Sequence, residues 1–309
     1  MPLKPLLLLT ECWDLFNPRD LRSLVTAAQV AEAEGIDGVM LSEHIVLGRN
    51  SESAGAKTNP REFDAPNNQP PTTAHPSSMV MLGAIAAATT RVRLFAGAIL
   101  PVLRHPLQVA KDLATLDLLS KGRLVVLPTV SWGEEEYAAL GKDFHKRGKM
   151  LDEQYEVWQK CWREGPASYS GEFYKFDEVY VEPKPYTPAG PRLWPTGAYL
   201  HPAALRRVVK YGSGYAPGGP MAPGEFDKIT EALTAAGRDP KTFEVMGGIM
   251  GRFKGTDDLA DLDEACKQIP ANVRSGATVV IAKPSQYIRS LDEFPAFCRR
   301  FAERVGSAG

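Results

Sequence analysis

Residues 90–141 read TRVRLFAGAILPVLRHPLQVAKDLATLDLLSKGRLVVLPTVSWGEEEYAALG, and this stretch decides the fold. Residues 92–100 and 123–130 are apolar and β-prone, which predicts two buried strands. Between them Pro106 suits a first helical turn, apolar residues follow at helical spacing, and Gly122 suits the position just past a helix end. Two strands joined by one helix form a parallel βαβ unit with a right-handed crossover.

The same alternation continues along the chain. Apolar runs predict strands at residues 6–10, 38–44, 92–100, 123–130, 192–197, 214–217, 243–253 and 277–283. Helical patterns fall at residues 17–35, 77–89, 106–120, 134–165, 202–211, 223–237, 257–269 and 284–305. Eight strands alternating with eight helices predict an α/β fold, a (β/α)8 TIM barrel, whose ligands bind at the carboxyl ends of the strands.

Two segments interrupt the regular pattern. Residues 46–75 are rich in Gly, Pro, Asn and Ser, and this insertion follows the second strand on the side of the active face. Residues 169–185 alternate in polarity and predict a β-hairpin before the fifth strand. No linker composition divides the chain, so residues 1–309 are expected to form a single domain.

The bulk composition excludes several functions. A net charge of −1 and a pI near 6.5 disfavour nucleic acid and anionic membranes as partners. The four cysteines are far apart and form no CxxC, so we expect no metal site and no disulfide framework. The apolar run at residues 6–9 is too short for a secretory or transmembrane segment, which predicts a cytoplasmic protein.

Polar and aromatic residues follow the second and fourth strands. His44 ends the second, where an imidazole can exchange a proton near neutral pH. Thr129, Ser131 and Trp132 follow the fourth, with hydroxyls for polar ring edges and an indole face for an aromatic ligand. The alternative is that His44 bonds a nearby loop, that Trp132 packs on the insertion and that the glutamates at 134–136 only complement a helix dipole.

Small residues mark three other strand ends. A glycine inside the third strand indicates a bulge or the close approach of another group, and small residues after the fifth and sixth strands expose backbone N–H groups that suit a phosphate. Ordinary turns and tight core packing are the alternatives. The candidate residues are Gly97, Ala98, Thr196, Gly197, Ala198, Gly218 and Gly219.

Other charged or imidazole side chains are weaker candidates. Arg104 and His105 are expected in a solvated turn, with phosphate binding as the alternative. The remaining histidines show no ligand-like spacing and are expected at the surface or at helix caps: His75, His145 and His201. Lys283, Arg252 or Lys254, at the ends of the last two strands, could supply a positive charge near a phosphate.

The chain resembles the luciferase-like family of flavin and deazaflavin oxidoreductases. The most specific similarity lies in the central block, with the sequence motifs RVRL, HPLQVAKDLATLDLLSKGRL and SWGEEEYAALG. GVMLSEH at 38–44, residues 144–162 and residues 170–197 are similar to the family as well. The resemblance covers roughly residues 5–250.

The resemblance implies an oxidoreductase that binds a flavin-like cofactor at the carboxyl ends of the strands. It places His44 beside the cofactor ring, a non-prolyl cis peptide at Gly97-Ala98, and the cofactor's phosphate near the turns after strands five and six. The turn PTVSWGEEEYAALG favours coenzyme F420 and hydride transfer to or from an organic substrate. In this interpretation His44 is the proton donor or acceptor, and Trp132 forms part of the substrate wall.

Two other functions stay open on the sequence alone. One is a two-component monooxygenase that uses reduced FMN and dioxygen, for which a reductase would supply the reduced cofactor. The other is a ligand-binding barrel without catalysis. Nearby aromatic residues suggest a hydrophobic or aromatic small molecule as substrate. Related barrels dimerise through helices, so we expect a homodimer.

Overall fold

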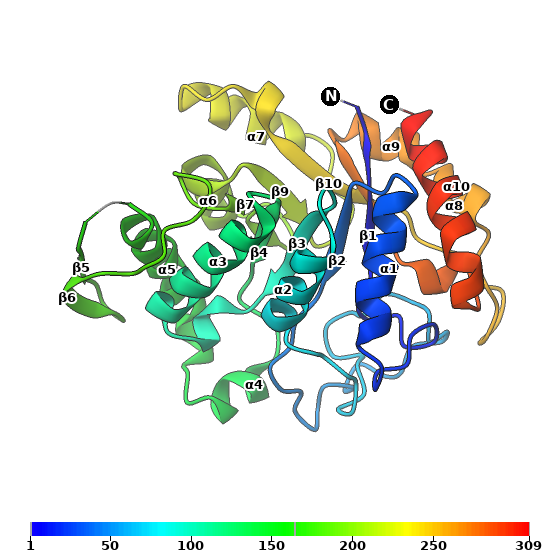
Figure 1. Cartoon of the computed structure of the whole chain (residues 1–309), viewed down its shortest axis with the longest axis horizontal. Coiled ribbons are helices and arrows are strands. Elements are labelled where there is room, and N and C mark those ends of the chain that lie inside the picture. The colour runs from blue at the N-terminus through cyan, green and yellow to red at the C-terminus, as the bar shows by residue number, and fades with distance from the viewer. Residues whose placement is uncertain (1, 164, 309) are drawn as a thin grey trace.

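The computed structural model describes residues 2–163 and 165–308. A sheet of nine parallel strands runs through it in the order β7-β4-β3-β2-β1-β11-β10-β9-β8. The sheet curls, and helices cover its outer side (Figure 1). The strands are β1 Lys4–Leu8, β2 Gly38–Leu41, β3 Arg93–Ile99, β4 Leu124–Pro128, β7 Arg192–Leu193, β8 Thr196–Gly197, β9 Gly214–Pro217, β10 Glu244–Gly248 and β11 Val279–Ala282.

The two edges of this sheet belong to one extended segment. β7 pairs with β4, and β8 pairs with β9, with Trp194 and Pro195 between them. The Trp194 N–H donates to the Val126 carbonyl at 2.8 Å, and the Ala216 N–H donates to the Pro195 carbonyl at 3.2 Å. The predicted fifth strand therefore exists as two short pieces, and the sheet curls as the predicted TIM-barrel class requires.

The helices follow most of the predicted pattern. Those at Pro106–Ser120 (α3) and Pro202–Tyr211 (α6) have the predicted bounds. His105 caps α3 by accepting the Leu107 N–H, and the chain leaves the helix through left-handed Lys121 and Gly122. The others are α1 Arg22–Ala33, α2 Ser78–Ala88, α4 Glu134–Ala139, α5 Arg147–Cys161, α7 Glu225–Ala235, α8 Leu262–Cys266, α9 Ile269–Arg274 and α10 Phe294–Gly306.

Four predicted helices are wrong in extent. The helix expected over 17–35 is shorter and runs from Arg22 to Ala33. The helix expected over 134–165 is broken at Gly141, whose φ is 65°, and Asp143 then caps the turn Phe144–Lys146 that leads into α5. The helix expected over 257–269 is instead α8, followed by α9. The segment expected to be a helix over 284–305 begins with the short turns Pro284–Gln286 and Leu291–Glu293, the second of which is started by a capping box between Ser290 and Glu293, and α10 follows directly.

The predicted hairpin is present. β5 Ala167–Ser170 and β6 Lys175–Val179 pair antiparallel in a separate sheet, which projects from the molecule beside α5 (Figure 1). Glu153 of α5 holds its turn, because its carboxylate accepts the backbone N–H groups of Glu172, Phe173 and Tyr174.

The insertion 46–75 has no helix or strand, yet it is anchored at the carboxyl ends of the strands. Asn59, fully buried, donates to the carbonyls of Gly255 and Asp258 at 3.0 Å each. Phe63 packs against the apolar cluster inside the curled sheet, which includes Leu8, Phe95 and Leu127. The insertion and α4 lie together at the lower edge of Figure 1, where β1 ends.

The opposite end of the sheet holds a buried ionic group. Arg93 donates to Asp37 and Glu244, and Lys4 donates to Glu244. Burial alone would raise the pKa of the Glu244 carboxyl, but Arg93 and Lys4 lower it below its ordinary value. Charge is thus paired at this end, which leaves the carboxyl ends of the strands for function.

Within the described residues, the helices are too short or too polar to cross a membrane.

Candidate functional site

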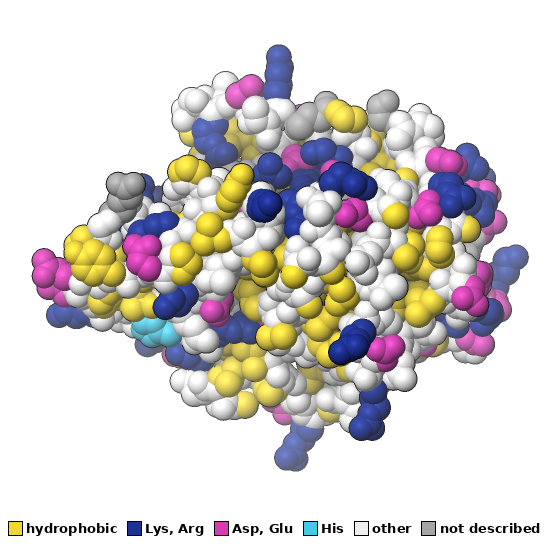
Figure 2. All heavy atoms as spheres, in the orientation of Figure 1, with side chains coloured by type: hydrophobic (Ala, Val, Ile, Leu, Met, Phe, Trp, Pro, Cys, Tyr) yellow, Lys and Arg dark blue, Asp and Glu magenta, His cyan; other side chains and the backbone are white. Residues whose placement is uncertain are grey.

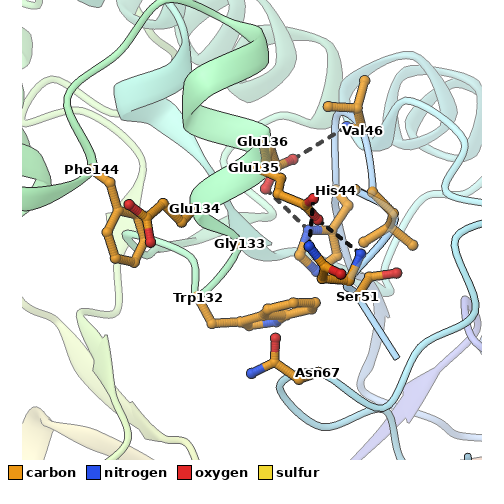
Figure 3. A pocket seen from close by; sticks show the side chains of 13 residues that line it. His44, Val46, Ser51, Asn67, Trp132, Gly133, Glu134, Glu135, Glu136 and Phe144 are labelled. Carbon is orange, nitrogen blue, oxygen red and sulfur yellow. Dashed lines mark hydrogen bonds and ion pairs between the residues drawn. The ribbon is translucent and has the colours of Figure 1, made fainter. Parts of the chain in front are cut away.

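The pocket that contains His44 lies between the insertion and the amino end of α4. Its volume is about 320 Å³. Side chains from the loop after β2, the turn after β4 and the insertion surround it (Figure 3). The lining residues are His44, Val46, Leu47, Gly48, Asn50, Ser51, Asn67, Trp132, Gly133, Glu134, Glu135, Glu136 and Phe144.

His44 is hydrogen-bonded to a buried carboxylate. Its Nδ1 lies 3.2 Å from Oε2 of Glu136, which is 1% exposed. Oε1 of Glu136 accepts the backbone N–H groups of Ile45 at 2.6 Å and Val46 at 3.3 Å. One carboxylate therefore holds both the imidazole and the backbone next to it (Figure 3).

The turn after β4 completes this arrangement. Ser131 has a φ of 60°, and its hydroxyl donates to Oε2 of Glu136 at 3.1 Å. The same hydroxyl oxygen accepts the Gly133 N–H at 3.2 Å. Trp132 lies edge-on to His44, with 5.2 Å between ring centroids. Ser131 and Trp132 are thus brought to His44 as candidate site residues.

His75 is not the surface or capping residue that the sequence suggested. It lies edge-on to His44, with 5.0 Å between ring centroids, and its Nε2 is 3.1 Å from Oε1 of Gln69. Burial lowers the pKa of His75 to about 4, and the nearby His44 adds to this effect. His75 is therefore uncharged near neutral pH. His201 does cap α6, and His145 is exposed, as predicted.

Arg104 is not in a solvated turn and is not free for a phosphate. Both of its terminal nitrogens donate to Glu43 at 2.8 Å, and Glu43 also accepts the Leu100 N–H and the Ser78 hydroxyl. Burial alone would raise the pKa of Glu43, but the bonds from Arg104 hold it below its ordinary value. This pair fixes the segment that carries His44.

The third strand has the bulge that its glycine predicted. The pairing of β3 with β4 shifts between Gly97 and Ile99, and the Gly97-Ala98 peptide is cis. A Cβ on Gly97 would approach Met40 Sδ to 2.8 Å and Leu127 Cδ2 to 2.9 Å. Thr129 donates its N–H to the Ile99 carbonyl at 2.9 Å. The ends of β2, β3 and β4 are therefore neighbours, and Ala98 and Thr129 lie at strand ends beside the His44 strand.

The turns after β8 and β9 also lie together. The Gly218 N–H donates to the Gly197 carbonyl at 2.8 Å, and a Cβ on Gly218 would approach Ala198 Cα to 3.2 Å. Ala198, Gly218 and Gly219 are exposed. These turns lie at the same end of the sheet as His44, because all these strands are parallel and each turn follows the carboxyl end of its strand. The candidate residues that do not line the His44 pocket are Gly97, Ala98, Thr129, Ser131, Thr196, Gly197, Ala198, Gly218 and Gly219.

Lys283 does not face a phosphate site. It is fully buried under the insertion and donates to the Glu62 carbonyl at 2.7 Å. Among residues 2–163 and 165–308, no three His, Cys, Asp or Glu side chains are grouped to hold a metal ion. The four cysteines are free and buried.

Sequence reasoning missed Glu136 and His75. Glu136 stands third in a run of three glutamates, and the run gives no sign of which one turns inward. Tyr137, the next residue, is buried and donates to the Val130 carbonyl, so the inward face of α4 includes positions 136 and 137. A helical wheel of this short segment could have found that face.

The fold and the site define an α/β protein with a curled parallel sheet and a histidine-lined pocket at the carboxyl ends of its strands. A family model described as luciferase-like monooxygenase matches residues 10–260, and the chain belongs to this family. It is a luciferase-like oxidoreductase.

Known relatives include proteins of more than one activity. An uncharacterized protein of Mycobacterium tuberculosis (strain ATCC 25618 / H37Rv) is 32% identical over 219 residues, covering 69% of this chain and 74% of that protein. Pyrimidine monooxygenase RutA of Yersinia enterocolitica is 33% identical over 116 residues, covering 36% of this chain and 31% of RutA. An F420-dependent secondary alcohol dehydrogenase, solved with an F420-acetone adduct, has the same fold with a TM-score of 0.71, 18% identity and full coverage of both chains.

Proposed function

We propose that this enzyme transfers a hydride between coenzyme F420 and a small organic substrate, with His44 exchanging the accompanying proton. The observation that carries the proposal is the imidazole of His44 in the wall of a pocket of about 320 Å³, held by Glu136 and edge-on to Trp132. Pockets that bind organic ligands have volumes of about 300 Å³ or more, so this pocket can hold a small molecule.

The cofactor type is a flavin or F420, and the residues at the strand ends fit such a group. Ala98, half-buried at the end of β3 next to the His44 strand, is the part of the bulge that a flat ring can reach. Gly97 lies beneath it, packed against Met40 and Leu127. Thr129 offers a hydroxyl at the edge of such a ring, whereas the Ser131 hydroxyl is bonded to Glu136 and Gly133 and positions this turn. The exposed turns that carry Ala198 and Gly219, next to Thr196, Gly197 and Gly218, are the proposed place for the phosphate.

The protein's own groups have three tasks in this mechanism. F420, when bound, supplies the hydride-accepting or hydride-donating ring carbon. His44 takes a proton from the substrate in the oxidising direction and returns it in the reducing direction. Trp132 and Phe144 form apolar walls, and the insertion closes the pocket on its other side with Val46, Ser51 and Asn67.

The relatives support a small-molecule substrate, and the aromatic walls favour a hydrophobic or aromatic one. The enzyme is expected in the cytoplasm, with a separate reductase where reduced cofactor is needed.

Reduced FMN with dioxygen is the second candidate, because RutA, named as a monooxygenase, is 33% identical over its matched region. In that reaction the same pocket would hold the substrate, and the cofactor would arrive already reduced.

The test is to titrate the protein with oxidised F420 and, separately, with FMN, and to follow the quenching of cofactor fluorescence. Saturable binding of F420, with reduction of F420 by members of a panel of small secondary alcohols, supports the proposal. His44→Gln is expected to bind F420 normally while turnover falls by about 10²- to 10⁴-fold. Saturable binding of FMN alone overturns the F420 assignment, and binding of F420 without turnover of any alcohol or carbonyl compound overturns the catalytic one.

A further inference from the structure

We propose that Glu136 is a positioning residue that fixes the tautomer of His44, with the proton on Nδ1 and the lone pair of Nε2 free for the substrate. This inference rests on the proposed function only for the identity of the reaction. The tautomer itself is a property of the protein without cofactor or substrate.

The carboxylate of Glu136 is surrounded by hydrogen-bond donors. Oε1 accepts two backbone N–H groups, from Ile45 and Val46, which can only donate. Oε2 accepts the Ser131 hydroxyl at 3.1 Å and lies 3.2 Å from Nδ1 of His44. Four neighbours around one carboxylate match the ionised form, which accepts and cannot donate.

The ionised carboxylate decides which ring nitrogen of His44 carries the proton. It repels a lone pair, so Nδ1 of His44 must present its N–H to Oε2. A neutral imidazole has one N–H, and therefore Nε2 carries the lone pair. Because Glu136 is 1% exposed, an Nδ1 lone pair facing Oε2 would be repelled by a buried charge that water cannot screen, which is costly.

The packing around His44 prevents its ring from turning over to offer Nδ1 instead. Trp132 and His75 meet His44 edge-on at 5.2 Å and 5.0 Å between ring centroids. The side chain of His44 is 10% exposed. Two rigid rings and one carboxylate thus define the ring plane (Figure 3 shows Trp132 and Glu136 around His44).

The surrounding charges agree with this arrangement. Glu43, the residue before His44, is paired with Arg104, so its charge is already compensated. His75 is uncharged near neutral pH because burial lowers its pKa to about 4. The charge at Glu136 is therefore available to stabilise the imidazolium that forms when Nε2 takes a proton.

The consequence for the reaction is directional. When an alcohol is oxidised, its C–H bond breaks and the hydride goes to F420, while its O–H bond breaks and the proton goes to Nε2 as the C=O bond forms. Neutral His44 in the Nδ1–H form is ready for this step. The Nε2–H form would have no lone pair toward the substrate.

The test uses the full chain labelled with ¹⁵N-histidine. With five histidines in the sequence, the His44 signals are assigned by their loss in His44→Gln. In the wild type above the pH of ring protonation, Nδ1 is expected to give the protonated, pyrrole-type signal and Nε2 the unprotonated, pyridine-type signal. The reverse pattern in the wild type overturns the proposal.

Glu136→Gln sharpens the test because it is nearly isosteric. The Gln oxygen can still accept from Ile45 and Val46, which places its NH₂ group toward His44 and turns Nδ1 into an acceptor. We expect the two ¹⁵N signals to exchange their types. We also expect kcat to fall by about 10²- to 10⁴-fold with little change in KM. Glu136→Asp, which keeps the charge, should retain the wild-type tautomer. An unchanged tautomer in Glu136→Gln overturns the proposal.

Glu153→Gln is the matched control. Glu153 also holds a loop through three backbone N–H groups, but it lies on α5 and does not line the pocket. It should lose thermal stability without changing the His44 signals. Failure of F420 to bind would contradict the proposed function and leave the tautomer result standing, so the two failures are distinguishable.

Discussion

His75 shows how burial, reinforced by the neighbouring His44, can set the charge of a side chain beside the site. Its folded-state pKa of about 4 lies below the ordinary value of 6.5, so between these two values the unfolded chain binds the proton and the folded protein does not. The free energy of unfolding is therefore expected to fall as the pH drops from about 6.5 to about 4.

His75→Gln removes this titration, so its stability should depend less on pH over the same interval. Urea unfolding of both proteins at a series of pH values measures the difference. His145→Gln is the control, because His145 is exposed and should leave the curve as it is. A His75→Gln curve parallel to that of the wild type would show that burial does not suppress the charge of His75.

At this scale the sequence predicts residue types at strand ends better than it predicts their partners. The sequence pattern places His44, Ser131 and Trp132 at the carboxyl ends of parallel strands, because each of them follows an apolar strand. From the same pattern, Glu136 is expected only to complement the dipole of its helix. Its actual partners, Ile45 and Val46, lie about ninety residues away along the chain, so the local pattern does not reveal them. Such contacts arise from packing of α4 on the loop after β2, which local pattern does not encode.

Among the elements, the Glu43–Arg104 pair joins the end of β2 to the connection between β3 and α3. Arg104→Met would leave the buried Glu43 carboxylate without its cation, and we expect a loss of about 3–5 kcal/mol in the free energy of unfolding. Adding Glu43→Gln should restore much of this loss, because the buried charge is then removed as well. Denaturant unfolding of both single variants and the double variant measures the coupling; additive effects would contradict it.

The insertion 46–75 behaves as an anchored cover rather than a free loop. Asn59→Ala removes two hydrogen bonds to the carbonyls of Gly255 and Asp258, at a cost of about 1–3 kcal/mol. Amide hydrogen exchange is expected to accelerate in residues 57–64 and to change little in α3.

Asn68→Ala is the control for this prediction. Asn68 accepts from Ala65 within the insertion, so its loss should not release the cover from the barrel. Equal exchange in both variants would mean that Phe63 and Lys283, rather than Asn59, hold the insertion down.

The elements also show where sequence patterns are sufficient. The bounds of α3 follow from the sequence because Pro106, a regular apolar stripe and Gly122 all agree. The bounds of α4 and α5 do not, since a glycine such as Gly141 carries a tolerable cost inside a helix, and its left-handed conformation depends on how α5 packs. The segment after β11 also differs from the pattern, because a capping box between Ser290 and Glu293 starts the short turn Leu291–Glu293 just before α10.

For the whole molecule, the parallel curled sheet follows from the number of βα units, because parallel strands joined by right-handed crossovers have few arrangements. The number of βα units does not predict that the fifth strand is divided at Trp194 and Pro195. Pro195 has no N–H, and the segment must turn from pairing with β4 to pairing with β9. That detail depends on closing the curl, which is a property of the complete sheet.

The outer surface of α2 bears on the expected homodimer. This helix, SMVMLGAIAAA, carries no charged residue, and Val80 is 71% exposed. Ala84 and Ala87 are exposed on the same side. Figure 2 shows hydrophobic side chains gathered over the middle of this face, where Figure 1 places α2 and α3. A helix that is apolar on all sides is normally covered, and a second copy can cover it with the same surface.

Ala84→Glu should therefore separate the dimer, because it puts two carboxylates against apolar surface on either side of the two-fold axis. Light scattering after gel filtration, over a range of protein concentrations, would show a dimer for the wild type and a monomer for the variant. Ala235→Glu, at an exposed position of α7, should remain dimeric. A wild type that is monomeric at every concentration would remove the dimer, and an Ala84→Glu variant that stays dimeric would move the interface away from α2. In both cases the pocket beside His44 is unaffected, because its lining residues lie at the carboxyl ends of the strands and none belongs to α2.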